Sequence, residues 1–298
     1  MHSKSFGDRM LDVFVYGFLI LLGFSTFYPF WNGLVISLND GMDTALGGIT
    51  FWPRKWSLEN YYVVFRDNRI MNAFMISVAR TALGTILSVL CTAIFAYGMT
   101  KKELVGRKFY MVMCIVTMYF GGGLIPTFLV IRGLGLMNTF WVFIIPGLIS
   151  VWNMIIFRTF FMGLPDGLEE SAKIDGCGNW STFFKIILPL SGPVIATLGL
   201  FTAVAHWNEW FLPSIYITNE KLLPIQSMLQ QILSTNIMTE QMSKLDSAAQ
   251  SRMTAMKSVT TKSLSMATMM VATLPIIAVY PFVQKYFVKG VLVGSLKE

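Results

Sequence analysis

The polar residues of this chain that are most able to do chemistry lie together near residue 208, where they interrupt an apolar segment. His206, Asn208 and Glu209 stand there beside Trp207 and Trp210. An indole face stacks on the C–H face of a pyranose, while amide and carboxylate groups hydrogen-bond sugar hydroxyls. This combination favours a translocation path for sugars.

A structural interpretation of the same residues stays open. Polar side chains between membrane helices hydrogen-bond one another, and tryptophans gather where the membrane meets water. Trp207 and Trp210 lie close to the expected outer end of their segment, which suits such a belt. Asn153, inside another apolar segment, is a further candidate for the path.

Arg80 lies inside a second apolar segment, residues 71–99. An ionisable side chain at membrane depth is a functional candidate by default. At the helical rise of about 1.5 Å per residue, Arg80 and Glu209 both fall in the outer half of their segments, so they can pair. We expect an interhelical salt bridge or a side chain that reaches the interface. Contact with an anionic ligand is the alternative.

The sequence offers no recognisable catalytic or metal site. It contains no G-x-x-x-x-G-K-[ST] phosphate loop, no HExxH motif and no G-x-S-x-G turn. The cysteines, Cys91, Cys114 and Cys177, lack metal-ligand spacing, and their odd number argues against a disulfide framework. The histidines, His2 and His206, have no triad partners. We therefore expect no cofactor, no metal and no ATPase site in this chain.

These residues belong to a strongly apolar chain. Of its 298 residues, 54% are hydrophobic and 13% are charged, and the mean hydropathy is +0.60. Soluble domains average about 25% charged residues, so we expect an all-α integral membrane protein embedded in the lipid bilayer. The net charge of +7 indicates membrane topology rather than nucleic-acid binding.

Six apolar segments are long enough to span a bilayer, which takes about 20 residues. They cover residues 11–38, 71–99, 109–131, 139–161, 191–213 and 263–285. A leader (1–10) precedes them, a polar segment (214–262) separates the last two, and a tail (286–298) follows. Six spans place both termini on one side. Basic residues in the leader, the short loop 100–108 and the tail predict that this side is the cytoplasm.

Residues 165–190 form a polar connection between two of the most apolar blocks. Glu169 and Glu170 suit the first turn of a short helix, Gly176 ends it, and Asn179 is a cap for a second helix. The sequence therefore predicts two short helices with one apolar and one charged face. The expected topology places them in the cytoplasm.

The spacing in this connection resembles the EAA loop of bacterial ABC importer permeases. The matching positions and their neighbours are Glu169, Glu170, Ser171, Ala172, Asp175, Gly176, Ile186, Leu188 and Pro189. Ser171 stands where the motif has alanine, and both residues are small. In that family the loop is a coupling helix that docks into a cleft of the ATPase subunit. The resemblance implies that residues 168–188 couple this chain to ATP hydrolysis.

The resemblance covers most of the chain. Residues 127–165, the motif AVAHWNEWF and the tail FVKGVLVGSLKE look like carbohydrate ABC importer permeases of the maltose-system type. The segment 214–262 is similar to the branch that imports larger or acidic oligosaccharides, including the alginate importer. The family implies a second, related permease subunit, two ATPase subunits that bind ATP and Mg, and an extracellular or periplasmic solute-binding protein. It also implies a location in the bacterial cytoplasmic membrane. In the maltose system, the other permease supplies most sugar contacts within the membrane.

Other functions remain as alternatives. An ABC importer for another small solute, such as an amino acid or phosphate, would share the loop but not WNEWF with the 214–262 insertion. An ion-driven secondary transporter would need coupling carboxylates near the midplane, whereas Glu209 lies near the outer edge. A membrane scaffold gives no reason for the loop spacing.

The charge of the substrate is also open. The expected outer segments carry the basic residues Arg54, Lys55, Lys221, Lys244, Arg252, Lys257 and Lys262. Such a set favours an anionic oligosaccharide, an acidic binding protein, or only the solvation of a long loop.

Overall fold

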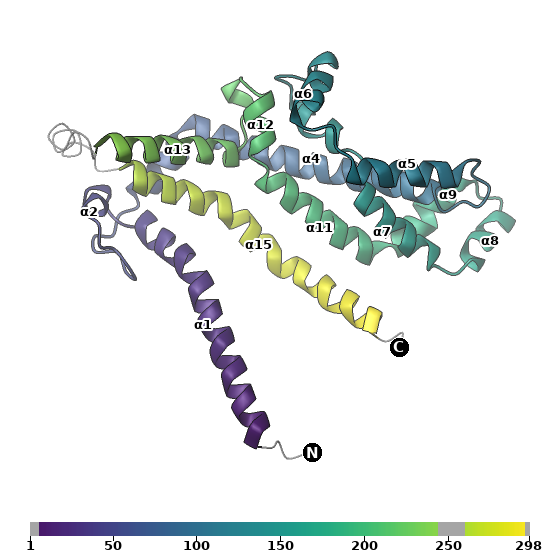
Figure 1. Ribbon diagram of the computed structural model, residues 1–298, viewed down its shortest axis with the longest axis horizontal. Helices are drawn as coiled ribbons and strands as arrows, with labels where there is room; N and C mark the ends of the chain where they lie inside the picture. Colours follow the sequence, from purple (N-terminus) through teal and green to yellow (C-terminus); the bar gives the residue numbers. More distant parts are fainter. Residues whose placement is uncertain (1–5, 244–259, 296–298) are drawn as a thin grey trace. The chain divides into compact units, whose positions relative to one another are not determined.

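The computed structural model describes residues 6–243 and 260–295, and within these ranges the chain is helical, with no strand and one isolated bridge between Asn39 and Trp56 (Figure 1). The all-α class predicted from the sequence is confirmed. Lys244, Arg252 and Lys257 of the expected basic set lie outside the described residues. Parts of the expected leader, tail and segment 214–262 lie outside them as well.

The helices follow one another through the whole described chain. The longer ones are α1 (Phe6–Ser37), α3 (Glu59–Arg66), α4 (Asn68–Gly98), α5 (Arg107–Tyr119), α6 (Leu124–Gly133), α7 (Val151–Met162), α8 (Gly167–Ile174), α11 (Gly192–Asn208), α12 (Phe211–Tyr216), α13 (Ile225–Ser243) and α15 (Thr261–Ser295). The short ones are α2 (Gly41–Ala45), η1 (Phe140–Phe143), η2 (Ile145–Gly147), α9 (Asn179–Thr182), the π-helical η3 (Phe183–Ile187), α10 (Leu188–Leu190) and η4 (Glu220–Leu222).

The helices long and apolar enough to cross a membrane on their own cover Met10–Ser37, Asn68–Gly98 and Thr261–Val279. Three further candidates are bent pairs: Arg107–Tyr119 with Leu124–Gly133 at 116°, Phe140–Gly147 with Val151–Met162 at 50°, and Asn179–Leu190 with Gly192–Asn208 at 81°. Counting each pair as one span gives up to 6 spans. The expected number of six stays a prediction.

Two helices differ from the expected spans at their ends. α11 ends at Asn208, before the expected limit of 213, because the backbone opens at Glu209 and Trp210 and α12 begins at Phe211. α15 continues past residue 285 to Ser295. The sequence after residue 285 contains no proline that would stop it.

The chain divides into two units, which are described separately. Unit 1 comprises Met1–Met71 and Leu229–Thr273. Its polar centre is Asn60, whose side-chain amide donates to the carbonyl oxygens of Ser37 and Asn39, both at 2.9 Å. The Ser263 hydroxyl donates to the Asn60 side-chain oxygen at 2.7 Å. These bonds fix the loop that follows α1 against the start of α15.

Unit 2 comprises Asn72–Met228 and Leu274–Glu298 and is organised by α4. One face of α4, here called the α4 stripe, carries small or polar residues three or four positions apart: Ser77, Arg80, Gly84, Ser88 and Thr92. Small residues let helices approach, and hydroxyls bond neighbouring backbones. Ser77 Oγ accepts the Ile225 amide at 2.9 Å, and Ser88 Oγ donates to the Gly147 carbonyl at 3.1 Å.

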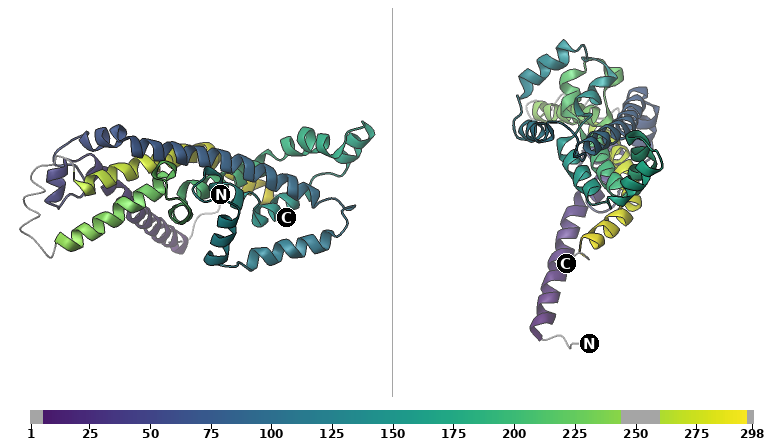
Figure 2. Two further views of the ribbon diagram at one scale, coloured as in Figure 1. Left: turned by 90° about the horizontal axis from the view of Figure 1, so that it is seen from above. Right: turned by 90° about the vertical axis from the view of Figure 1, so that its right-hand side faces the viewer.

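An apolar cluster at the C-terminal end of α4 holds α7, η3 and α11 together. Its buried members include Tyr97, Phe157, Phe161, Phe183, Ile187 and Leu198. The Tyr97 and Phe183 ring centroids lie 5.2 Å apart. The cluster anchors one side of the connection 165–190, and α8 lies at the extremity of unit 2 (Figures 1 and 2).

Candidate functional site

Unit 2 contains two places where the predicted site residues gather, and the first is the connection 165–190, here called the EAA-type loop. The two predicted short helices are confirmed as α8 and the α9–η3–α10 segment. The cap predicted at Asn179 is wrong, because Gly178 holds the N-cap position and Asn179 is the first residue of α9.

Gly176 makes the turn between these helices. Its φ is +79°, a left-handed conformation that glycine adopts without strain. The Gly176 and Cys177 amides donate to the carbonyls of Lys173 (3.0 Å) and Ala172 (2.8 Å), which closes the end of α8. A Cβ on Gly176 would meet nothing within 4 Å. Within this chain, substitutions of Gly176 are therefore limited by its backbone conformation and not by lack of space.

The EAA-type loop has one packed face and one exposed face. Ala172, Phe183 and Ile187 are buried, at 2%, 1% and 2% exposed. Ile174, by contrast, is 86% exposed, and Trp180 is exposed and stacked on Phe184 at 6.1 Å. The remaining predicted coupling residues divide into the exposed Glu170, Ser171, Asp175, Gly176 and Pro189 and the half-buried Glu169, Ile186 and Leu188.

Glu169 forms an ion pair with Lys101 of the same chain. Lys101 Nζ lies 2.5 Å from its Oε2 and 2.7 Å from the Tyr97 hydroxyl, and 4.0 Å from the Tyr97 ring centroid. Burial works against the Lys101 charge, but the hydrogen bonds with Glu169 and Tyr97 outweigh it and raise the pKa of Lys101. The pair ties α8 to the end of α4. The sequence did not predict a role for Lys101, although it lies in the basic loop 100–108.

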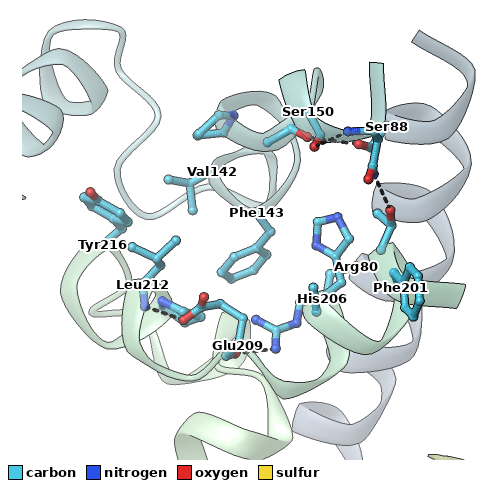
Figure 3. A pocket seen from close by; sticks show the side chains of 16 residues that line it. Arg80, Ser88, Val142, Phe143, Ser150, Phe201, His206, Glu209, Leu212 and Tyr216 are labelled. Carbon is cyan, nitrogen blue, oxygen red and sulfur yellow. Dashed lines mark hydrogen bonds between the residues drawn. The ribbon is translucent and has the colours of Figure 1, made fainter. Parts of the chain in front are cut away.

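The second place is a cavity of about 390 Å³ in unit 2, here called the Arg80 cavity (Figure 3). It brings together four of the path candidates: Arg80, Asn153, His206 and Glu209. The other three do not line it. Trp207 is 5% exposed and packs edge-on against Phe74 at 5.9 Å, while Asn208 and Trp210 are exposed elsewhere.

Arg80 hydrogen-bonds backbone carbonyls at the C-terminal end of α11. Its Nη2 donates to the backbone carbonyl of Glu209 at 2.5 Å and to that of Trp207 at 3.4 Å. The last carbonyls of a helix have no partner within it, so a buried cation is favourable there. The Arg80 side chain is 1% exposed, and Cζ lies 5.5 Å from the Phe143 ring centroid. The expected salt bridge with the Glu209 carboxylate, or a side chain that reaches the interface, is therefore wrong: Arg80 is buried and binds the backbone oxygen of Glu209.

Glu209 satisfies backbone amides at the start of α12. Its Oε1 accepts hydrogen bonds from the amides of Phe211 at 2.9 Å and Leu212 at 3.1 Å. A carboxylate at a helix N-terminus satisfies unpaired amides and offsets their partial positive charge. Arg80 and Glu209 thus hold opposite sides of the break between α11 and α12, which explains why this segment is not one helix.

His206 occupies a close contact between α11 and α4. A Cβ added to Gly84 would lie 2.7 Å from His206 Nε2, so glycine at this point of the α4 stripe lets the imidazole lie directly on the helix. The role of Gly84 was not predicted, although the Gly84-x-x-x-Ser88 spacing indicates close helix packing. Phe143 and Tyr216 of the cavity wall were not predicted either, because no local sequence pattern marks them.

No group of three or more His, Cys, Asp or Glu side chains suited to a metal comes together within the described ranges. The geometry instead combines a helical loop with an exposed face and a polar, aromatic-walled cavity among membrane-type helices. Residues 13–293 match the family described as binding-protein-dependent transport system inner membrane component. The chain belongs to this family.

Similar members of this transport family cover nearly the whole chain. The polygalacturonan/rhamnogalacturonan transport system permease protein YtcP of Bacillus subtilis (strain 168) is 38% identical over 291 residues, which are 97% of this chain and 99% of YtcP. Protein LplC of the same organism is 38% identical over 298 residues, covering 100% of this chain and 98% of LplC.

The fold also matches a chain in the crystal structure of a bacterial ABC transporter involved in the import of the acidic polysaccharide alginate. The TM-score is 0.82 at 26% identity, over 96% of this chain and 100% of that chain. The resemblance inferred from the loop spacing and the WNEWF segment is confirmed.

Proposed function

We propose that this chain is the transmembrane permease subunit of an ATP-driven ABC importer for oligosaccharides. The observation that carries this proposal is the match of almost the whole chain, at 38% identity, to a permease named for polygalacturonan and rhamnogalacturonan transport. The two-faced EAA-type loop and the polar cavity supply the parts that such a subunit needs.

Coupling to ATP hydrolysis passes through the EAA-type loop. Its exposed face, with Glu170, Ile174 and Trp180, docks into a cleft of an ATPase subunit, which binds ATP and Mg. Its packed face and the Glu169–Lys101 pair connect that movement to α4. The helical rise gives about 25 Å along α4 from Tyr97 to Arg80. Motion of the loop therefore reaches the Arg80 cavity through one continuous helix.

The complete importer contains, on this proposal, a second related permease, two ATPase subunits and an extracellular solute-binding protein. The chain crosses the bacterial cytoplasmic membrane six times, and its termini and the EAA-type loop face the cytoplasm. Residues 214–262 face outward. An acidic oligosaccharide is the narrower substrate hypothesis, favoured by the relatives named for polygalacturonan and alginate.

The orientation is tested by labelling. Ser234→Cys in α13, in a background without Cys91, Cys114 and Cys177, is expected to react in intact cells with a membrane-impermeant maleimide. A cysteine at Ser171 in the EAA-type loop serves as the control and reacts only after permeabilisation. The reverse pattern would invert the topology.

The function is tested with the purified importer and its solute-binding protein. ATPase activity is measured with an oligogalacturonate, the same oligomer after methyl esterification, and an arabino-oligosaccharide. We expect stimulation by at least one of these sugars through the binding protein. Stimulation by the galacturonate alone supports the acidic substrate. No stimulation by this panel, together with stimulation by an amino acid or phosphate, would contradict the oligosaccharide function.

A further inference from the structure

The connection between α4 and α5, here called the basic loop (residues 100–108), exposes apolar side chains at its tip. Val105 is 88% exposed and Leu104 is 36% exposed. The loop has a defined backbone, in which the Arg107 amide donates to the Leu104 carbonyl at 3.3 Å and Gly106 adopts a left-handed φ of +74° before α5. The fold therefore holds these apolar side chains outward instead of burying them.

Basic side chains flank this apolar tip. The loop contains four basic residues and one acidic residue, Glu103. Lys101 is paired with Glu169 of α8, whereas Lys102 and Lys108 are exposed. After the Lys101 charge is balanced by Glu169, three basic residues still face one acidic residue. The exposed surface of the basic loop is therefore positive as well as apolar.

An exposed apolar face of α5 begins directly at this loop. Phe109, Val112 and Val116 are 65%, 58% and 53% exposed and stand three or four positions apart, so they share one side of the helix. Lys108 lies four positions before Val112, one turn nearer the loop on the same side. A lysine at the end of a membrane helix lays its apolar stem along that side and places its ammonium group at the level of the lipid headgroups.

We infer that the basic loop binds an anionic phospholipid surface of the membrane. Leu104 and Val105 enter the boundary between headgroups and acyl chains, and Lys102 and Lys108 contact headgroup phosphates. Apolar burial and attraction to anionic lipids add to the same binding free energy when both kinds of side chain lie on one surface. This binding does not depend on which solute the permease carries.

An ATPase subunit is the other candidate occupant, because the Lys101–Glu169 pair joins the basic loop to α8. Continuity favours the membrane. The apolar tip of the loop leads into the exposed side of α5, and α5 together with α6 is apolar enough to be a candidate span. The positive charge next to that span matches anionic headgroups.

The test places a fluorophore on Val105→Cys in the full-length chain, in a background without Cys91, Cys114 and Cys177. The assembled importer is reconstituted in nanodiscs made of equal parts of phosphatidylcholine and phosphatidylglycerol, with brominated acyl chains on one lipid or the other. Bromine quenches the fluorophore only at contact, so the ratio of quenching by the two lipids reports which headgroup lies at the loop. Both faces of a nanodisc present the same lipids, so the result does not depend on the orientation of the chain.

We expect phosphatidylglycerol to quench at least about twofold more strongly than phosphatidylcholine, because the lysines attract its charge. The double variant Lys102→Gln/Lys108→Gln is expected to bring the ratio close to one. Salt at 1 M, where the Debye length is about 3 Å, is expected to do the same. Lys173→Gln/Lys185→Gln is the matched control, because it removes two exposed lysines of the EAA-type loop and keeps the preference.

Equal quenching by the two lipids, with Lys102 and Lys108 intact, would show apolar insertion without headgroup preference and overturn the anionic partner. No quenching by either lipid would place the loop in water. Quenching that appears only after the ATPase subunits are removed would make the ATPase the occupant. A preference that persists in Lys102→Gln/Lys108→Gln would contradict the role given to these lysines.

Discussion

The EAA-type loop and the break between α11 and α12 both place charged residues between apolar helices, but they use them differently. In the loop, Glu169 is paired with Lys101 while Glu170 and Ile174 remain exposed. At the break, Arg80 and Glu209 each satisfy backbone groups of the chain itself. The loop thus leaves part of its charged surface exposed, where the proposed ATPase would dock, whereas the charges at the break hold the chain's own geometry.

Polar residues in a membrane protein can thus have two different roles. A polar side chain that ends or begins a helix contributes to folding first, and only its remaining atoms are available to a ligand. A polar side chain that the fold leaves exposed on a packed loop is available to a partner in full. The following predictions test that division.

The largest effect is expected at the loop surface. Gly176→Trp places a bulky side chain on the proposed docking face and forces a non-glycine residue into a left-handed conformation, which costs about 1–2 kcal/mol. We expect membrane insertion to continue and binding-protein-stimulated ATPase activity to fall at least about tenfold, which corresponds to about 1.4 kcal/mol.

Gly135→Trp is the matched control. Gly135 also has a left-handed φ, +69°, and open space around its Cβ, but it lies outside the loop. We expect the Gly135→Trp importer to keep the binding-protein-stimulated ATPase activity of the wild type. Normal stimulation in Gly176→Trp would show that the loop is not the docking surface.

The second effect is expected at the break. Arg80→Gln leaves two carbonyls at the end of α11 without their cation. It is expected to lower the free energy of unfolding by about 2–4 kcal/mol, measured by equilibrium SDS denaturation. Arg132→Gln, at an exposed position of α6, is the control.

Transport assays sharpen this prediction. If Arg80 mainly holds the break, uptake of a uronate oligomer and of a neutral oligomer of equal length falls equally. A much larger loss for the uronate would instead assign Arg80 to substrate charge. Unchanged stability together with unchanged uptake would contradict both roles.

The sequence predicted the loop well because its determinants are local. Two carboxylates, a glycine and a second amphipathic turn lie within one short stretch, and Gly176 has the backbone conformation that its type suggests. The hydrogen-bond partners of Arg80 could not be predicted from such local patterns. They lie 127 and 129 positions away, and they are carbonyl oxygens, which every residue possesses. The sequence therefore marked Arg80 as unusual without indicating what it binds.

The smallest effect is expected at the Glu169–Lys101 pair, which links the packed side of the loop to α4. The pair is partly exposed, so a double-mutant cycle with Glu169→Gln and Lys101→Met is expected to give a coupling free energy of about 1 kcal/mol. A coupling energy near zero would mean that the packed aromatic cluster alone connects the loop to α4.

The pH dependence of this coupling follows from the raised pKa of Lys101. A raised pKa adds stability that is complete below the ordinary value of 10.5 and disappears as the pH rises through the higher folded value. We expect constant coupling between about pH 6 and pH 9. A loss within that interval would contradict the assignment.

On the proposed function, this chain carries oligosaccharides when a partner ATPase drives it through the EAA-type loop. The most direct test is accumulation of labelled trigalacturonate in proteoliposomes that contain the assembled importer, with the solute-binding protein outside and ATP inside. We expect accumulation that requires both the solute-binding protein and ATP and that is lost in Gly176→Trp. Accumulation in Gly176→Trp at the wild-type rate, or accumulation driven by an ion gradient without ATP, would contradict it.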